Sequence, residues 1–110
     1  MELKEERDGS ALVVSVGGRI DSNNAKSFEE QFLGFIKAGN PSVVLDMSAL
    51  DYISSAGLRV ILMGAKQQGA AEGKLALTGM SDHIREVFEI SGFAKILTIL
   101  PTRAEGVAAV

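Results

Sequence analysis

The sequence predicts a single α/β domain over residues 1–110, in which a mixed, mostly parallel sheet of four or five strands is covered by about four helices. Segments rich in β-branched residues alternate with segments of helical periodicity. The first two strand segments are separated only by a turn, which favours an antiparallel hairpin. The later strand segments are separated by helices, which favours parallel pairing.

Turn and cap residues divide the chain into these elements. Asp8-Gly9-Ser10 is a turn signal, and Gly17-Gly18 ends the second strand or bends it. Asp21–Asn24 and Ser81-Asp82 are helix N-cap residues, and Gly92 is a helix stop. The expected strands are residues 3–7, 11–16, 42–46, 74–78 and 96–99; the expected helices are residues 25–39, 55–68, 82–91 and 101–110, with a loop at residues 47–53.

The composition excludes several classes of function. The absence of cysteine excludes a disulfide scaffold and thiolate chemistry, and one histidine is too few for a usual zinc site, so we expect no metal and no cofactor. The net charge is −3 and the basic residues are scattered, which favours neither nucleic acid nor a membrane surface as partner. The first ten residues are charged, unlike a secretory signal, and no apolar run reaches membrane-spanning length. A cytoplasmic protein is therefore expected.

Residues 43–61 carry most of the functional information. They read VVLDMSALDYISSAGLRVI, a buried strand followed by a short loop and a serine-rich helix start. This resembles the phosphorylation segment of anti-sigma-factor antagonists of the STAS-domain type, whose common form is Asp-Ser-Ser/Thr-Gly-Leu-Gly. Alignment on Gly57-Leu58 implies that Ser55 is the phosphoacceptor. Ser54 takes the place of the usual aspartate and is the alternative acceptor, and Ala56 takes the second hydroxyl position.

A second segment, Gly18-Arg19-Ile20-Asp21, resembles the family's Gly-x-Leu/Ile-Asp motif. The resemblance implies that Asp21 lies near the phosphoserine, so Asp21, Ser54 and Gly57 are expected to support the phosphosite. Asp46 and Asp51 are expected to sharpen the negative field there. Helix capping is the competing interpretation for the two serines and for Asp21.

A helix N-terminus suits a phosphorylation switch for physical reasons. Its first backbone N–H groups lack partners and carry a partial positive charge, so a phosphate is tolerated there. The phosphate adds a charge of about −1.5 to −2 to the surface. Phosphorylation is therefore expected to alter the surface without unfolding the domain.

The helix after Ser55 is expected to present a docking face. At about 100° per residue, one stripe is predicted to face the sheet: Leu58, Ile61, Leu62 and Ala65. The opposite side is predicted to bind a partner: Ala56, Arg59, Val60 and Met63. Burial of that side under another helix or a dimer partner is the alternative.

The resemblance implies a partner-switching regulator, present as a monomer or weak dimer, and not an enzyme. The unphosphorylated form would bind an anti-sigma factor that is also a serine kinase, freeing a sigma factor for transcription. Phosphorylation would release it, and a serine/threonine phosphatase of the metal-dependent type would reset it. STAS domains also serve in stressosome-like assemblies, lipid-transport complexes and anion transporters, which is one alternative. A serine hydrolase is the other, although His83 is the only histidine base and no Gly-x-Ser-x-Gly elbow is present.

Overall fold

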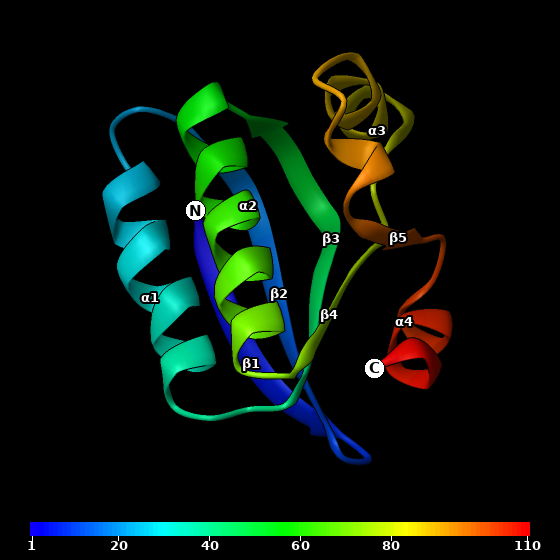
Figure 1. Ribbon diagram of the computed structural model, residues 1–110. Helices are drawn as coiled ribbons and strands as arrows, with labels where there is room; N and C mark the ends of the chain where they lie inside the picture. Colours follow the sequence, from blue (N-terminus) through cyan, green and yellow to red (C-terminus); the bar gives the residue numbers. More distant parts are fainter.

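The sheet orders its five strands as they occur in the chain, β1-β2-β3-β4-β5, in the computed structural model, which describes all of residues 1–110 (Figure 1). β1 is antiparallel to β2, and every later pair is parallel. The strands are β1 Glu2–Asp8, β2 Ala11–Ile20, β3 Ser42–Ile53, β4 Lys74–Thr78 and β5 Thr98–Leu100; the helices are α1 Ala25–Lys37, α2 Ser55–Ala70, α3 Asp82–Ile90 and α4 Arg103–Ala109. The predicted mixed sheet with four helices is confirmed.

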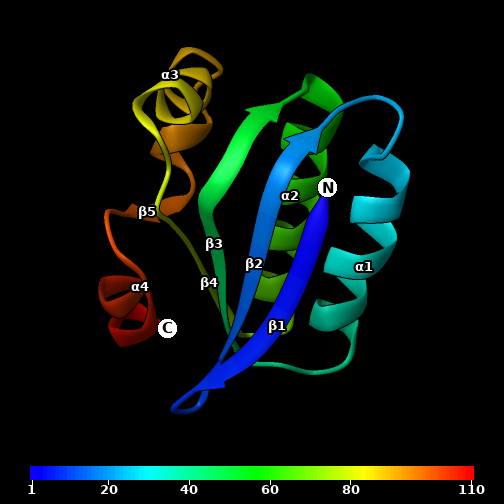
Figure 2. The same cartoon turned by 180° about the vertical axis from the view of Figure 1, so that it is seen from behind.

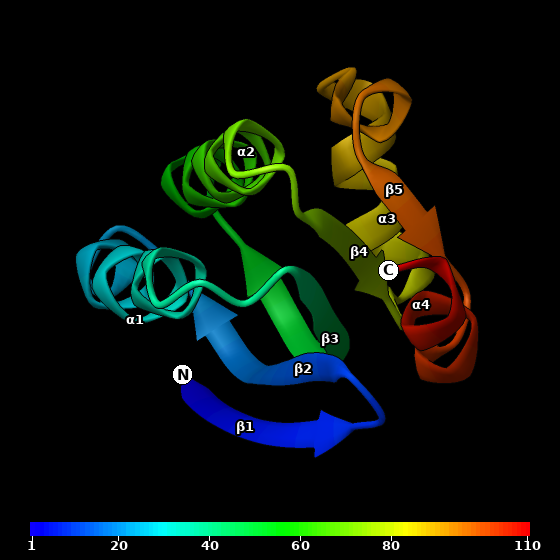
Figure 3. The same ribbon diagram turned by 60° about the horizontal axis from the view of Figure 1, so that its bottom comes forward.

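The sheet is covered unequally on its two faces. Helices α1 and α2 lie side by side over one face (Figure 3). Seen from behind, β1 and β2 stand in front of these helices, and α4 packs against the sheet near β3 and β4 (Figure 2). Alternate residues of β2 serve the two faces: Leu12 and Val14 enter the main core, whereas Ala11 and Val13 join a small cluster completed by Val107 of α4.

Helix α2 packs against α1 as well as against the sheet. Gly64 of α2 faces Phe32 of α1 so closely that a Cβ at residue 64 would overlap the phenyl ring. Phe32 is held in place by Phe28, whose ring stacks on it at a centroid distance of 5.4 Å. The buried arc of α2 is therefore wide, since two neighbours cover it.

β3 is longer than the sequence predicts, and the loop expected at residues 47–53 is a continuation of this strand. The pairing with β2 continues through Gly17 opposite Ala49 and Ile20 opposite Ile53. Two register shifts in this stretch, one on each side of Gly17-Gly18, disturb the alternation that normally marks a strand. Gly18 adopts φ 82°, a left-handed conformation that glycine adopts without strain.

The C-terminal third follows its predicted caps. The Ser81 hydroxyl accepts a hydrogen bond from the Ile84 N–H at 3.2 Å, and Gly92 ends the α3 region with φ 82°. The last strand begins at Thr98 and not at Ile96, because a 3-10 turn at Phe93–Lys95 occupies the intervening chain.

Candidate functional site

The start of α2 is attached to the carboxyl ends of β2 and β3. Ile20 and Ile53 are paired as the last residues of these strands. The next residue, Ser54, donates its backbone N–H to the Ile20 carbonyl at 2.8 Å. The first turn of α2 is thereby fixed against the end of the sheet, which positions the two serines.

Ser54 and Ser55 do different things. Ser54 is the N-cap of α2, and its half-buried side-chain Oγ accepts a hydrogen bond from the Gly57 N–H at 3.3 Å. Ser55 is the first helical residue; it is exposed, and its hydroxyl makes no hydrogen bond within the protein. The capping interpretation therefore applies to Ser54, while Ser55 presents a free hydroxyl to solvent.

Gly57 allows the helix to begin this close to the strands. A Cβ at residue 57 would lie 2.7 Å from Cγ2 of Ile20 and 2.8 Å from Cγ1 of Ile53. Any side chain would push the first turn of α2 away from the sheet. Gly57 thus supports the geometry around Ser55 by lacking a side chain.

Asp21 organises the turn that leads from β2 into α1. Its Oδ1 accepts hydrogen bonds from the backbone N–H groups of Asn23 at 2.9 Å and Asn24 at 3.3 Å. The Asn24 side chain in turn accepts from the Asp21 N–H at 2.9 Å. Asp21 directly follows Ile20, the residue bonded to Ser54, so this capping-type turn borders the start of α2.

Arg19 and Tyr52 form an exposed pair on the same end of the sheet. They are cross-strand partners, and the Arg19 guanidinium lies 4.4 Å from the centre of the Tyr52 ring, a cation–π contact. Asp51 precedes Tyr52 and is also exposed. The sequence reasoning missed the Arg19–Tyr52 pair, because its register depends on the two shifts around Gly17-Gly18.

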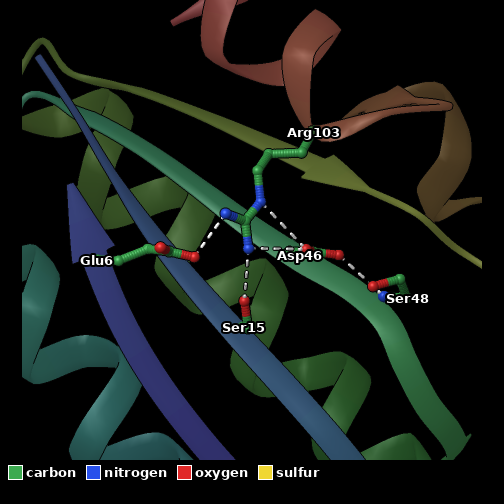
Figure 4. Close-up of polar contacts among 5 residues, drawn as sticks. All are labelled: Glu6, Ser15, Asp46, Ser48 and Arg103. Carbon is green, nitrogen blue, oxygen red and sulfur yellow. Dashed lines mark hydrogen bonds and ion pairs between the residues drawn. The ribbon is translucent and has the colours of Figure 1, made fainter. Parts of the chain in front are cut away.

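Asp46 lies elsewhere, which corrects the expectation that it strengthens the field at the phosphosite. It is only 8% exposed and turns toward Arg103 at the start of α4 (Figure 4). Its Oδ2 accepts from Arg103 Nη2 at 3.3 Å, and its Oδ1 accepts from the Ser48 N–H at 3.0 Å. The Asp46 carboxylate is therefore engaged in structural contacts with Arg103 and Ser48.

The Arg103 guanidinium ties three strands to α4. Besides Asp46 on β3, it donates to Glu6 on β1 at 2.5 Å and to the Ser15 hydroxyl on β2 at 3.2 Å (Figure 4). The hydrogen bond to Glu6, assisted by Asp46, raises the pKa of Arg103 above its ordinary value despite partial desolvation. The sequence offered no signal for this cluster, since Arg103 and Glu6 are far apart in the chain.

The exposed face of α2 differs from the predicted docking face. Val60 is 3% exposed and belongs to the core, which corrects its assignment to the outer side. Met63 and Leu62 are both half-buried, but only Met63 packs against the core, although Leu62 was the one predicted to face the sheet. Ala56 is half-buried. The side chains that share the solvent-facing side of α2, here called the outer stripe, are Ser55, Arg59, Leu62 and Lys66.

The contacts of the Ser55 hydroxyl bear on the serine-hydrolase alternative. No base is hydrogen-bonded to it, so the nucleophile–base contact of a serine hydrolase is not formed. No cluster of three or more histidine or carboxylate side chains could hold a metal ion. None of the helices has the length and apolar character needed to cross a membrane.

Comparison with known proteins relates the chain to STAS domains and anti-sigma factor antagonists. The family model of the STAS domain matches residues 2–106. BtrV of Bordetella bronchiseptica, a candidate anti-sigma factor antagonist, is 41% identical over 99% of this chain and 94% of its own length. The anti-sigma-B factor antagonist of Listeria monocytogenes is 29% identical over 96% of this chain and 91% of its own length. The crystal structure of an anti-sigma factor antagonist from Mycobacterium paratuberculosis superposes with a TM-score of 0.91 at 25% identity, covering 99% of this chain and 92% of that one.

Proposed function

This chain belongs to the STAS domain family of anti-sigma factor antagonists, and on that premise we propose that it is a partner-switching regulator controlled by phosphorylation of Ser55. Its unphosphorylated form binds and sequesters an anti-sigma factor that is also a serine kinase. Phosphate on Ser55 releases this partner. A serine/threonine phosphatase of the metal-dependent type removes the phosphate and resets the switch.

The observation that carries this proposal is the division of roles between the two serines. The Ser54 hydroxyl is engaged in the cap and half-buried, whereas the Ser55 hydroxyl is exposed and unbonded. A kinase can therefore reach Ser55 without breaking the start of α2. The backbone around it is held by the Ser54–Ile20 hydrogen bond, so the added phosphate changes the surface and leaves the fold in place.

The outer stripe supplies a docking surface of defined chemistry. Leu62 is a partly exposed apolar residue flanked along the stripe by the cations Arg59 and Lys66. A partner that complements this pattern has acidic groups around an apolar contact. A phosphate on Ser55, at the first position of the same stripe, repels such acidic groups. The same surface thus explains both binding and release.

Phosphopeptide mapping after reaction with the cognate kinase tests the acceptor. We expect all phosphate on Ser55, none on a Ser55→Ala variant, and undiminished labelling of Ser55 in a Ser54→Ala variant. Labelling confined to Ser54 would refute the proposal. Affinity measurements on the two forms complete the test, since the phosphorylated protein is expected to bind the kinase far more weakly.

A pair of leucine and isoleucine variants tests the docking surface. Leu62→Glu places a charge in the outer stripe, and we expect it to raise the Kd for the kinase at least about tenfold, or about 1.4 kcal/mol. Ile90→Glu is the matched control, because Ile90 is 79% exposed on α3 and lies outside the stripe. If both variants bind with unchanged affinity, the partner docks elsewhere. Circular dichroism confirms that each variant is folded.

A further inference from the structure

Arg59 is a cation without an assigned partner inside the molecule. It is exposed on α2 and takes part in neither of the two ion pairs, both of which belong to Arg103. No acidic residue lies in the first turn of α2. The positions three and four residues from Arg59 along the helix are all uncharged: Ser55, Ala56, Leu62 and Met63. The guanidinium is therefore available to a negative charge that arises next to it.

Ser55 lies one helical turn before Arg59, at the spacing that brings two side chains together on a helix surface. Helical side chains lean toward the N-terminus, so Arg59 covers the turn that carries Ser55. A negative group placed four residues before a positive one is also the more favourable order for such a pair. Both side chains are exposed and share the outer stripe.

We propose that Arg59 binds the phosphate carried by Ser55 within the same helix, an inference that rests on the proposed function. A guanidinium presents two parallel N–H donors that match two phosphate oxygens. Arg19, near the ends of β2 and β3, is instead stacked on Tyr52. Lys66 lies about three helical turns beyond Ser55, out of reach of its phosphate.

This pairing gives the switch a second component. In the unphosphorylated protein, Arg59 is free to contact acidic groups of the partner. Once Ser55 is phosphorylated, the same guanidinium is drawn to the phosphate and withdrawn from the docking surface. Phosphorylation therefore removes an attractive charge from the outer stripe while it adds a repulsive one.

A titration of phosphoserine by 31P NMR tests the pairing. Phosphoserine is installed at residue 55 during synthesis, so the measurement does not depend on any kinase. A cation that binds the dianion lowers the second pKa of the phosphate. We expect Arg59→Gln to raise that pKa by about 0.2–0.4 unit, Arg59→Lys to raise it less, and the matched control Lys66→Gln to leave it unchanged. An equal pKa in the parent and Arg59→Gln proteins would overturn the proposal.

The side-chain Nε–H signal of Arg59 provides an independent readout. It is expected to lie further downfield in the protein carrying phosphoserine at residue 55 than in the unmodified protein. An unshifted signal would overturn the pairing. A pKa change produced by Arg19→Gln and not by Arg59→Gln would assign the phosphate to Arg19. These outcomes are separate from the mapping of the acceptor. If the kinase labels Ser54, the proposed function fails even where the Ser55–Arg59 pairing is measured.

Discussion

Replacing each of the two adjacent serines by alanine separates the cap from the switch. Ser54→Ala removes the side chain that caps α2 and leaves the Gly57 N–H without its acceptor. Ser55→Ala removes a hydroxyl that has no partner in the protein. Ser54→Asp is the matched control, since aspartate is also a strong N-cap residue and can accept the same hydrogen bond.

The size of the Ser54→Ala effect follows from two opposing features. The 3.3 Å distance between Ser54 Oγ and the Gly57 nitrogen marks a long hydrogen bond, which places its loss in the lower part of the range for caps. Gly57 is buried, however, so its N–H is poorly placed to find water instead. Together these indicate a loss of about 1–2 kcal/mol in the free energy of unfolding. The melting temperature should fall by roughly 3–10 °C.

Urea unfolding followed by circular dichroism measures the difference. Ser54→Ala should lower the midpoint at unchanged m-value, Ser54→Asp should restore it, and Ser55→Ala should stay within about 0.5 kcal/mol of the parent protein. The reasoning is refuted if Ser55→Ala is the more destabilising of the two alanine variants. In that case Ser55, and not Ser54, would hold the helix start.

Three further predictions concern the frame around the site. Gly57→Ala should lower the free energy of unfolding by about 1–3 kcal/mol, because the added methyl group overpacks against Ile20. Gly69→Ala, in open space on the same helix, should leave the thermal stability unchanged or raise it. Arg103→Met should lower the unfolding free energy by about 1–3 kcal/mol, because it leaves the buried Asp46 carboxylate without its cation; an equal loss from Glu6→Gln would contradict this ranking. Phosphorylation should shift amide resonances mainly at residues 19–23 and 51–63, and shifts throughout α4 would instead indicate a global rearrangement.

Local signals in the sequence predicted most elements correctly. The turn Asp8-Gly9-Ser10 marks the β1–β2 hairpin, and Ser81 and Gly92 delimit α3 because each acts through its own backbone neighbourhood. The pair Ser54-Ser55 was correctly placed at a helix start. Such features depend on residues within a few positions of each other, which is why the sequence alone reveals them.

The predictions that the structure contradicts concern residues whose packing partners are distant in the sequence or segments whose buried positions lack apolar side chains. Half of the six buried positions of α2 are not hydrophobic: Gly57, Gly64 and Gln68. A helical wheel based on hydrophobicity therefore misplaces the buried face of α2 and assigns Val60 to the solvent-facing side. The register shifts beside Gly17-Gly18 concealed the length of β3. The partner of Asp46 lies 57 residues away, beyond any local pattern.

The agreement between strand order and chain order has a consequence for how the molecule is made. Every strand pairs with the one synthesised just before it, so the sheet can extend one strand at a time as the chain leaves the ribosome. The main exception to this sequential assembly is Arg103, which returns across 97 residues to Glu6. That contact cannot form until residue 103 has emerged. The link between α4 and β1 therefore forms only after all five strands have been synthesised.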